Sequence, residues 1–147
     1  ALDVSVQAQI IALIRSLART RGTAVMLITH DMGVIAETAD RVAVMYAGRL
    51  AEIGPVRDVL KHARHPYSQG LMGSIPTLAQ SAERLVQIPG TMPRLDAIPP
   101  GCAFNARCPH AFDRCRAERP SLVETGASKV ACWLPAGTAG GWPGGRA

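Results

Sequence analysis

All cysteines of this 147-residue chain lie in one segment, in the pattern Cys102-x5-Cys108-x6-Cys115-x16-Cys132. Such clustering indicates a shared site, either two disulfides or one metal centre with four thiolate ligands. The pattern lacks the C-x2-C pair usual in structural zinc sites, which weakens zinc without excluding it, and four thiolates also suit a [4Fe-4S] cluster. Because no secretory segment is recognisable, we expect a reducing compartment, in which disulfides are the minority alternative.

The neighbours of these cysteines favour a structural metal site over a catalytic one. Three arginines could offset the thiolate charge and three aromatic residues could exclude water: Arg107, Arg114, Arg116, Phe104, Phe112 and Trp133. The alternative is that the arginines are solvated and the aromatic residues form a small core. A metal centre would supply stability that so short a segment lacks. We interpret His110 as a solvated loop residue, because four cysteines already complete the site.

A second polar group, Thr29-His30-Asp31, directly follows the apolar run Ala24–Ile28. A short continuous apolar run is typical of a buried parallel strand, and open α/β sheets bind ligands at the carboxyl ends of such strands. His30 is therefore a candidate functional residue. The simpler interpretation is that Asp31 caps the next helix and His30 is an incidental loop residue.

The elements that would position His30 follow an α/β pattern. Apolar residues recur at helical spacing between the N-cap candidate Asp3 and Gly22, and Ala47-Gly48 is typical of a tight turn. The predicted elements are a helix over 4–20, a strand over 24–28, a helix over 31–39 and strands over 41–46 and 49–53. This order indicates the closing portion of an α/β domain.

Beyond Gly54 the pattern changes. Pro55 fits the first turn of a short helix through Lys61, a second helix is predicted over 67–73, and prolines dominate the following linker. We therefore divide the chain into an α/β part (1–54), a helical extension with linker (55–96), a four-cysteine module (97–134) and a Gly/Pro/Ala-rich tail (135–147) that we expect to be disordered.

Composition excludes several classes of protein. The longest apolar runs have five or six residues, too few to span a membrane, while 48% hydrophobic content is too high for a wholly disordered chain. The net charge of +5 permits an anionic partner, but the basic residues are dispersed and only 4% of residues are aromatic, so we expect no nucleic-acid binding.

Several motifs together resemble the back half of an ABC-transporter nucleotide-binding domain. They are Ala1-Leu2-Asp3, Leu27-Ile28-Thr29-His30-Asp31, Ala39-Asp40-Arg41-Val42 and Met45-Tyr46-Ala47-Gly48-Arg49. The resemblance implies an ABC-type, RecA-like α/β fold. It also implies that Asp3 is the D-loop aspartate at the interface between two nucleotide-binding domains, and that His30 is the switch histidine that contacts the γ-phosphate and helps orient the attacking water. Catalysis of phosphoryl transfer depends mainly on such positioning.

Later motifs resemble the oligopeptide/dipeptide importer subgroup of that family. They are His65-Pro66-Tyr67, Gly70-Leu71-Met72, Ile75-Pro76, the segment 88–93 and the segment 99–109. The subgroup carries a [4Fe-4S] cluster at its C-terminal cysteines, which implies this cofactor for Cys102, Cys108, Cys115 and Cys132, with Zn²⁺ as the alternative. We expect His65-Pro66-Tyr67 to be a helix entry, with Pro66 in the first turn and Tyr67 packed inward, and to have no catalytic role.

The phosphate loop, the glycine-rich signature loop and the Asp-Glu pair that ABC ATPases use with ATP and Mg²⁺ are absent from these residues. We therefore expect an N-terminally truncated portion of a transport ATPase, inactive by itself. The resemblance implies a second ATPase subunit, identical or paralogous, two transmembrane permease subunits and, indirectly, an extracytoplasmic solute-binding protein. It implies a peripheral location on the cytoplasmic face of the bacterial inner membrane, and import of peptides or a related solute such as nickel.

Two alternatives remain open. One is a stand-alone four-cysteine metal-binding module, or a remnant, without ATPase activity. The other is a regulatory or nucleic-acid-binding protein that uses its positive charge.

Overall fold

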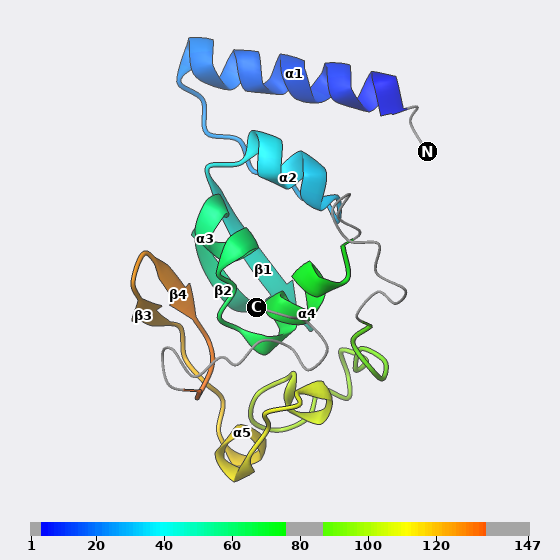
Figure 1. The fold of residues 1–147 in the computed structure, drawn as a ribbon, viewed down its shortest axis with the longest axis vertical. Coiled ribbons are helices and arrows are strands. Elements are labelled where there is room, and N and C mark those ends of the chain that lie inside the picture. Colours follow the sequence, from blue (N-terminus) through cyan, green and yellow to red (C-terminus); the bar gives the residue numbers. More distant parts are fainter. Residues whose placement is uncertain (1–3, 76–86, 135–147) are drawn as a thin grey trace. The chain divides into compact units, whose positions relative to one another are not determined.

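The computed structural model describes residues 4–75 and 87–134 and divides the chain into two compact units, residues 1–40 and 41–147 (Figure 1). Asp3 and the tail 135–147 lie outside the described residues, so the predictions for them stay predictions. The architecture is α/β with a small antiparallel sheet. No helix in the described ranges is long and apolar enough to span a membrane.

The first unit contains two helices, α1 (Val4–Arg21) and α2 (Met32–Thr38). Both were predicted from the sequence, and Asp31 caps α2 as expected. Apolar residues on α1 remain accessible to solvent: Val6, Ile10, Leu13 and Leu17 are 40 to 60% exposed. Helical spacing and capping are local signals, so both helices form although much of the apolar face of α1 is uncovered.

The predicted parallel strand over 24–28 is wrong for this structure. These residues form no ladder, and Met26 and Ile28 are 89% and 90% exposed. A strand has no internal hydrogen bonds and needs a neighbour to pair with its backbone. None of the described residues pairs with this segment, so its apolar composition alone does not produce a strand.

The second unit begins with the predicted hairpin, β1 (Arg41–Tyr46) and β2 (Arg49–Pro55). Ala47 and Gly48 both have positive φ, 47° and 74°, as the two-residue turn requires. The helices α3 (Val56–Lys61) and α4 (Pro66–Gly73) follow, and both contact β2 (Figure 1). Pro55 ends β2 and is the N-cap of α3, whereas the sequence predicted it inside the first turn of that helix.

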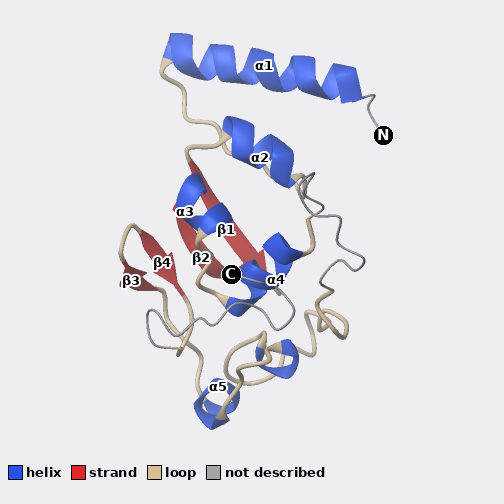
Figure 2. Cartoon of the chain, viewed as in Figure 1, coloured by secondary structure: helices blue, strands red, loops and turns tan. Residues whose placement is uncertain are grey.

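The cysteine segment, residues 97–134, is not a separate module but extends the sheet of this hairpin. It consists of η1 (Asn105–Arg107), α5 (Asp113–Ala117), β3 (Val123–Thr125) and β4 (Ser128–Val130), joined by loops (Figure 2). β4 pairs with β2, giving one antiparallel sheet in the order β1-β2-β4-β3. A Cβ on Gly54 would lie 2.8 Å from Ser128 Cβ, so glycine permits this close approach of the two strands.

The core of the second unit joins three segments that are distant in sequence. Tyr46 from β1 stacks at a tilt on Tyr67 from α4, with ring centroids 4.7 Å apart, and meets the edge of Phe104 at 5.1 Å. Phe104 is 1% exposed. Pro66 lies in the first turn of α4 and Tyr67 packs inward, as predicted. Aromatic pairs of this kind contribute beyond their buried area, so the hairpin and the cysteine segment stabilise each other.

Candidate functional site

His30 lies in a short, well-defined loop of the first unit. Asp31 Oδ1 accepts hydrogen bonds from Gly33 N at 2.9 Å and Val34 N at 3.2 Å, and Thr29 Oγ1 accepts one from Asp31 N at 3.0 Å. These bonds fix the backbone on both sides of His30, whose own side chain is exposed. The capping interpretation of Asp31 is thus correct, and it leaves the imidazole of His30 free to meet a ligand.

Each of the four cysteines occupies a different local structure. Cys102 N donates to Cys115 O at 2.8 Å, Cys108 caps η1, Cys115 lies in α5 and Cys132 follows β4. Gly101, with φ of 73°, precedes Cys102, and a Cβ there would collide with the backbone of Cys115 and Arg116. The close approach of these two cysteine-bearing backbones therefore requires glycine.

All four cysteines are free thiols, and their electrostatic coupling shows that they are neighbours. Burial raises the pKa of Cys102, Cys108 and Cys132, to about 11 for Cys108. Nearby thiolates raise these pKa values further: Cys115 acts on Cys102 and Cys132, and all three other cysteines act on Cys108. Negative charge is therefore costly in this cluster unless a cation compensates it.

The described residues include no group of three or more His, Cys, Asp or Glu side chains arranged to hold a metal ion. The described residues therefore do not show the metal-binding module that the sequence predicted. The sulfurs of a tetrahedral zinc site lie about 4 Å apart, since each Zn–S bond measures about 2.3 Å. The four thiols share one neighbourhood without forming that compact arrangement.

The flanking arginines are engaged in local structure. Arg107 Nε donates to Pro89 O at 2.8 Å and its Nη1 to Tyr46 Oη at 3.3 Å. Arg114 lies over the ring of Trp133 at 3.7 Å and pairs with Glu118, while Arg116 pairs with Asp113. The exposure of Arg114 and Arg116 and the place of Phe104 in the core agree with the alternative of solvated arginines and an aromatic core, whereas Arg107 is partly buried. Phe112 is 40% exposed, so it contributes little to excluding water from the cysteines.

His110 differs from its prediction as a solvated loop residue. Its Nε2 is buried and has no hydrogen-bond partner within the part of the chain that the structure describes. Its backbone N–H bonds to the Cys108 sulfur and lowers the pKa of that thiol, against the larger effect of burial. The turn that brings the His110 N–H to the Cys108 sulfur also buries the His110 imidazole nitrogen. The spacing of the cysteines in the sequence could not predict this burial.

Glu52 is a structural residue that the sequence analysis missed. It is fully buried at 0% exposure, and its carboxylate accepts hydrogen bonds from Arg64 N at 3.0 Å and His65 N at 3.0 Å. His65 Nδ1 in turn accepts from Tyr67 N at 3.0 Å and caps α4. A glutamate in an otherwise apolar strand was the available signal, because a buried carboxylate needs donors to offset its desolvation. Glu52 thus holds the entry of α4 against β2.

Comparison with known proteins places these features in a family. The family model described as the oligopeptide/dipeptide transporter C-terminal region matches residues 51–115. The chain is 47% identical over 135 residues to the dipeptide transport ATP-binding protein DppD of Bacillus subtilis, covering 91% of this chain and 40% of that protein. It is 48% identical over 122 residues to DppD of Escherichia coli, covering 83% and 37%.

A third relative, the oligopeptide transport ATP-binding protein OppD of Salmonella typhimurium, is 45% identical over 135 residues, covering 92% of this chain and 40% of that protein. The chain thus spans about two fifths of the length of these curated relatives. The similarities confirm the resemblance that the sequence motifs indicated.

Proposed function

Because this chain belongs with the oligopeptide/dipeptide transport ATP-binding proteins and carries their C-terminal region, we propose that it is the C-terminal portion of an ABC-type transport ATPase that energises import of peptides or a related solute. The observation that carries the proposal is the similarity along 91% of the chain, which joins the cysteine segment to the residues around His30. In the complete protein, ATP with Mg²⁺ closes two ATPase subunits, and hydrolysis reopens them.

Partners and location follow from the same proposal. A second ATPase subunit, identical or paralogous, faces this one across shared ATP sites, and Asp3 contributes the D-loop carboxylate to that interface. Two permease subunits carry the solute through the membrane and hold the ATPase at its cytoplasmic face, with an extracytoplasmic solute-binding protein supplying the solute. The exposed apolar side chains of α1 support the assignment, since further chain of the longer protein would cover them.

His30 is the proposed switch histidine. Its exposed imidazole stands on a backbone that the Thr29 and Asp31 hydrogen bonds hold in place, which suits a group that contacts a γ-phosphate and orients water. In the complete protein, we expect His30→Ala to lower ATP turnover by about 100-fold or more while nucleotide affinity changes little. Steady-state hydrolysis and equilibrium nucleotide binding measure the two effects separately.

His62→Ala is the matched control, because His62 is an exposed histidine at the end of α3. It should leave both quantities unchanged. Turnover that survives His30→Ala would refute the catalytic assignment, and a loss of nucleotide binding in step with turnover would indicate a structural role instead.

We further propose that Cys102, Cys108, Cys115 and Cys132 hold a [4Fe-4S] cluster, with Zn²⁺ as the alternative. Four free thiols fit such a cluster when they are buried or half-buried and near one another, because four irons and four sulfides spread their ligands more widely than one ion does. When bound, the cluster supplies positive charge that stabilises the thiolates and links loops of the cysteine segment. Independently of any cofactor, the backbone hydrogen bond from Cys102 N to Cys115 O holds the first of these cysteines against α5.

Anaerobic purification tests the cofactor. We expect a brown protein with about four irons and four sulfides per chain, and loss of both in Cys108→Ser. A colourless protein with one zinc per chain would select the alternative.

A stand-alone four-cysteine protein is the second candidate function. The compactness of residues 41–147, with a sheet and core of their own, favours it. Sequencing the coding DNA upstream of Ala1 distinguishes the two. A phosphate loop, signature loop and Asp-Glu pair in frame support the ATPase, and a start codon without them supports the separate protein.

A further inference from the structure

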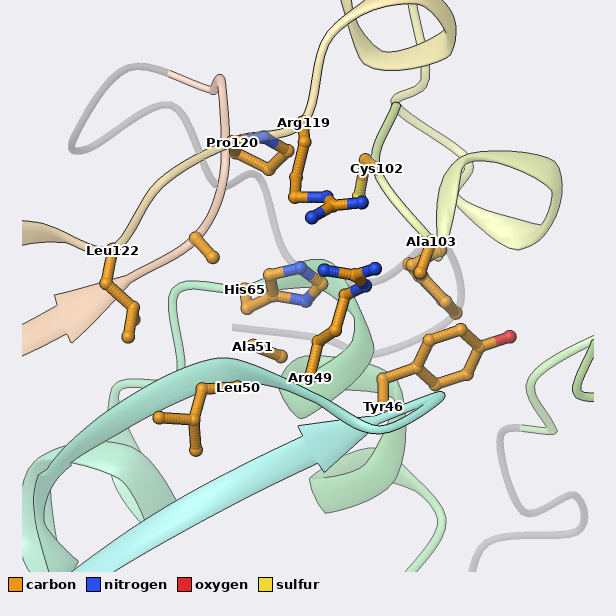
Figure 3. A pocket seen from close by; sticks show the side chains of 12 residues that line it. Tyr46, Arg49, Leu50, Ala51, His65, Cys102, Ala103, Arg119, Pro120 and Leu122 are labelled. Atoms are coloured by element: carbon orange, nitrogen blue, oxygen red, sulfur yellow. The ribbon is translucent and has the colours of Figure 1, made fainter. Parts of the chain in front are cut away.

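A pocket of about 300 Å³ in the second unit is lined by residues of both the β1–β2 hairpin and the cysteine segment (Figure 3). Three basic side chains line it from three separate places in the sequence. Arg49 comes from the start of β2, His65 from the N-cap of α4 and Arg119 from the loop after α5. Figure 3 shows these three side chains pointing into the same space. The pocket therefore exists only when the hairpin and the cysteine segment are folded together.

The basic side chains of this pocket have no acidic partner, although Cys102, one of the thiols proposed to hold the cluster, is also in its wall. No carboxylate is among the lining residues, and within the described ranges neither Arg49 nor Arg119 forms an ion pair. Guanidinium groups stay charged at every physiological pH, so two that share one pocket repel each other. An anion bound between the two guanidinium groups attracts both of them and offsets this repulsion.

His65 adds a fixed hydrogen-bond donor. Its Nδ1 accepts from Tyr67 N at 3.0 Å, which places the ring proton on Nε2. The residue is 3% exposed, and burial lowers its pKa to about 4, so the ring is neutral at pH 7 and keeps a single N–H to offer. Glu52 fixes the His65 backbone through a 3.0 Å hydrogen bond. The donor is thus held in position before any ligand arrives.

The rest of the pocket is mainly apolar, with Leu50, Phe104, Pro120 and Leu122 among its walls. We propose that the pocket binds a small organic carboxylate, with its head between Arg49 and Arg119 and its hydrocarbon body against the apolar walls. A guanidinium group can donate two parallel hydrogen bonds to a carboxylate. Inorganic phosphate has no hydrocarbon part to bury, so it would gain nothing from the apolar walls. This inference is independent of the transport function proposed above.

Titration of the whole ¹⁵N-labelled chain with sodium pentanoate tests the proposal. We expect saturable shifts of amide signals from residues 49–51, 65, 119, 121 and 122, and no saturable shift with the uncharged pentanamide. Inorganic phosphate should bind at least tenfold more weakly than pentanoate. Arg49→Ala and Arg119→Ala should each weaken pentanoate binding about tenfold or more, the usual effect of losing one charge-assisted hydrogen bond.

Arg57→Ala is the matched control, since Arg57 is an exposed arginine of α3 outside the pocket. It removes the same charge and should leave the affinity unchanged. The side chains of Arg49 and Arg119 make no hydrogen bond or ion pair within the described residues, so both variants should keep the dispersed spectrum of the folded unit. Absence of saturable pentanoate shifts, equal weakening by Arg57→Ala, or phosphate binding as tight as pentanoate would overturn the proposal.

Discussion

The two units of this chain are stabilised in different ways. The described part of the first unit forms two helices with capping and helical spacing but leaves Val6, Ile10, Leu13 and Leu17 exposed, whereas the second unit closes a sheet over an aromatic core. Helices satisfy their backbone locally, but a sheet requires distant segments to meet. The second unit thus contains the partners that its strands need, while the apolar run over 24–28 has none among the described residues.

Removing the core of the second unit should have the largest effect. Phe104→Ala should destabilise residues 41–134 by about 3–5 kcal/mol, because it leaves a cavity between Tyr46 and Tyr67. Near-ultraviolet circular dichroism during urea unfolding reports on this core, which contains both tyrosines of the chain. The amide signals of α1 should not change.

Phe112→Ala provides the matched comparison. Phe112 is 40% exposed, so its loss should cost less than about 1 kcal/mol. Equal effects of the two variants, or simultaneous melting of α1, would show that the two units do not differ as described.

Acid should destabilise the second unit selectively. Burial lowers the pKa of His65 from its usual 6.5 to about 4, so between these values the unfolded chain binds the proton more readily. The stabilisation is therefore complete above pH 6.5 and is lost as the pH falls to about 4, a change of up to about 3 kcal/mol. Urea midpoints measured from pH 7 to pH 4 should follow this decline.

His65→Asn should flatten that pH dependence, since asparagine does not titrate and can still accept the Tyr67 N–H as an N-cap. His62→Asn, at an exposed histidine, should leave the dependence intact. An unchanged slope in His65→Asn would assign the acid sensitivity to another group.

Loss of the α2 cap should have the smallest effect and remain within the first unit. Asp31→Ala removes the acceptor for Gly33 N and Val34 N and should cost about 1 kcal/mol of local helix stability. Hydrogen exchange of the α2 amides should accelerate, while β1 and β2 amides keep their rates. Asp40→Ala, an exposed aspartate that caps no helix, is the control and should change neither.

Local signals predicted much of this fold. The Asp31 cap, the Ala47-Gly48 turn and the Pro66 helix entry all appear as expected, because each depends on residues within a few positions. The pairing of β2 with β4 was not foreseen, since it depends on residues far apart in the chain.

The candidate site shows the same division. Spacing predicted that the four cysteines share one site, and this stays a prediction. It carried no information about the depth of burial that raises the pKa values of Cys102, Cys108 and Cys132. It likewise missed the inward-facing His110 Nε2 and the buried Glu52. The burial of these two side chains arises because backbone segments that are distant in sequence meet only in the folded unit.

The pairing of Glu52 with Val130 also has a consequence for protein synthesis. A ribosome makes the chain from its N-terminus, so the β2 edge emerges long before the β4 residues that cover it. During that interval the nascent hairpin exposes an open strand edge and the unfilled side of Tyr46, which are sites for misassociation with other chains. The sheet is therefore completed only after β4 has been translated, and by then three of the four cysteines have also been added.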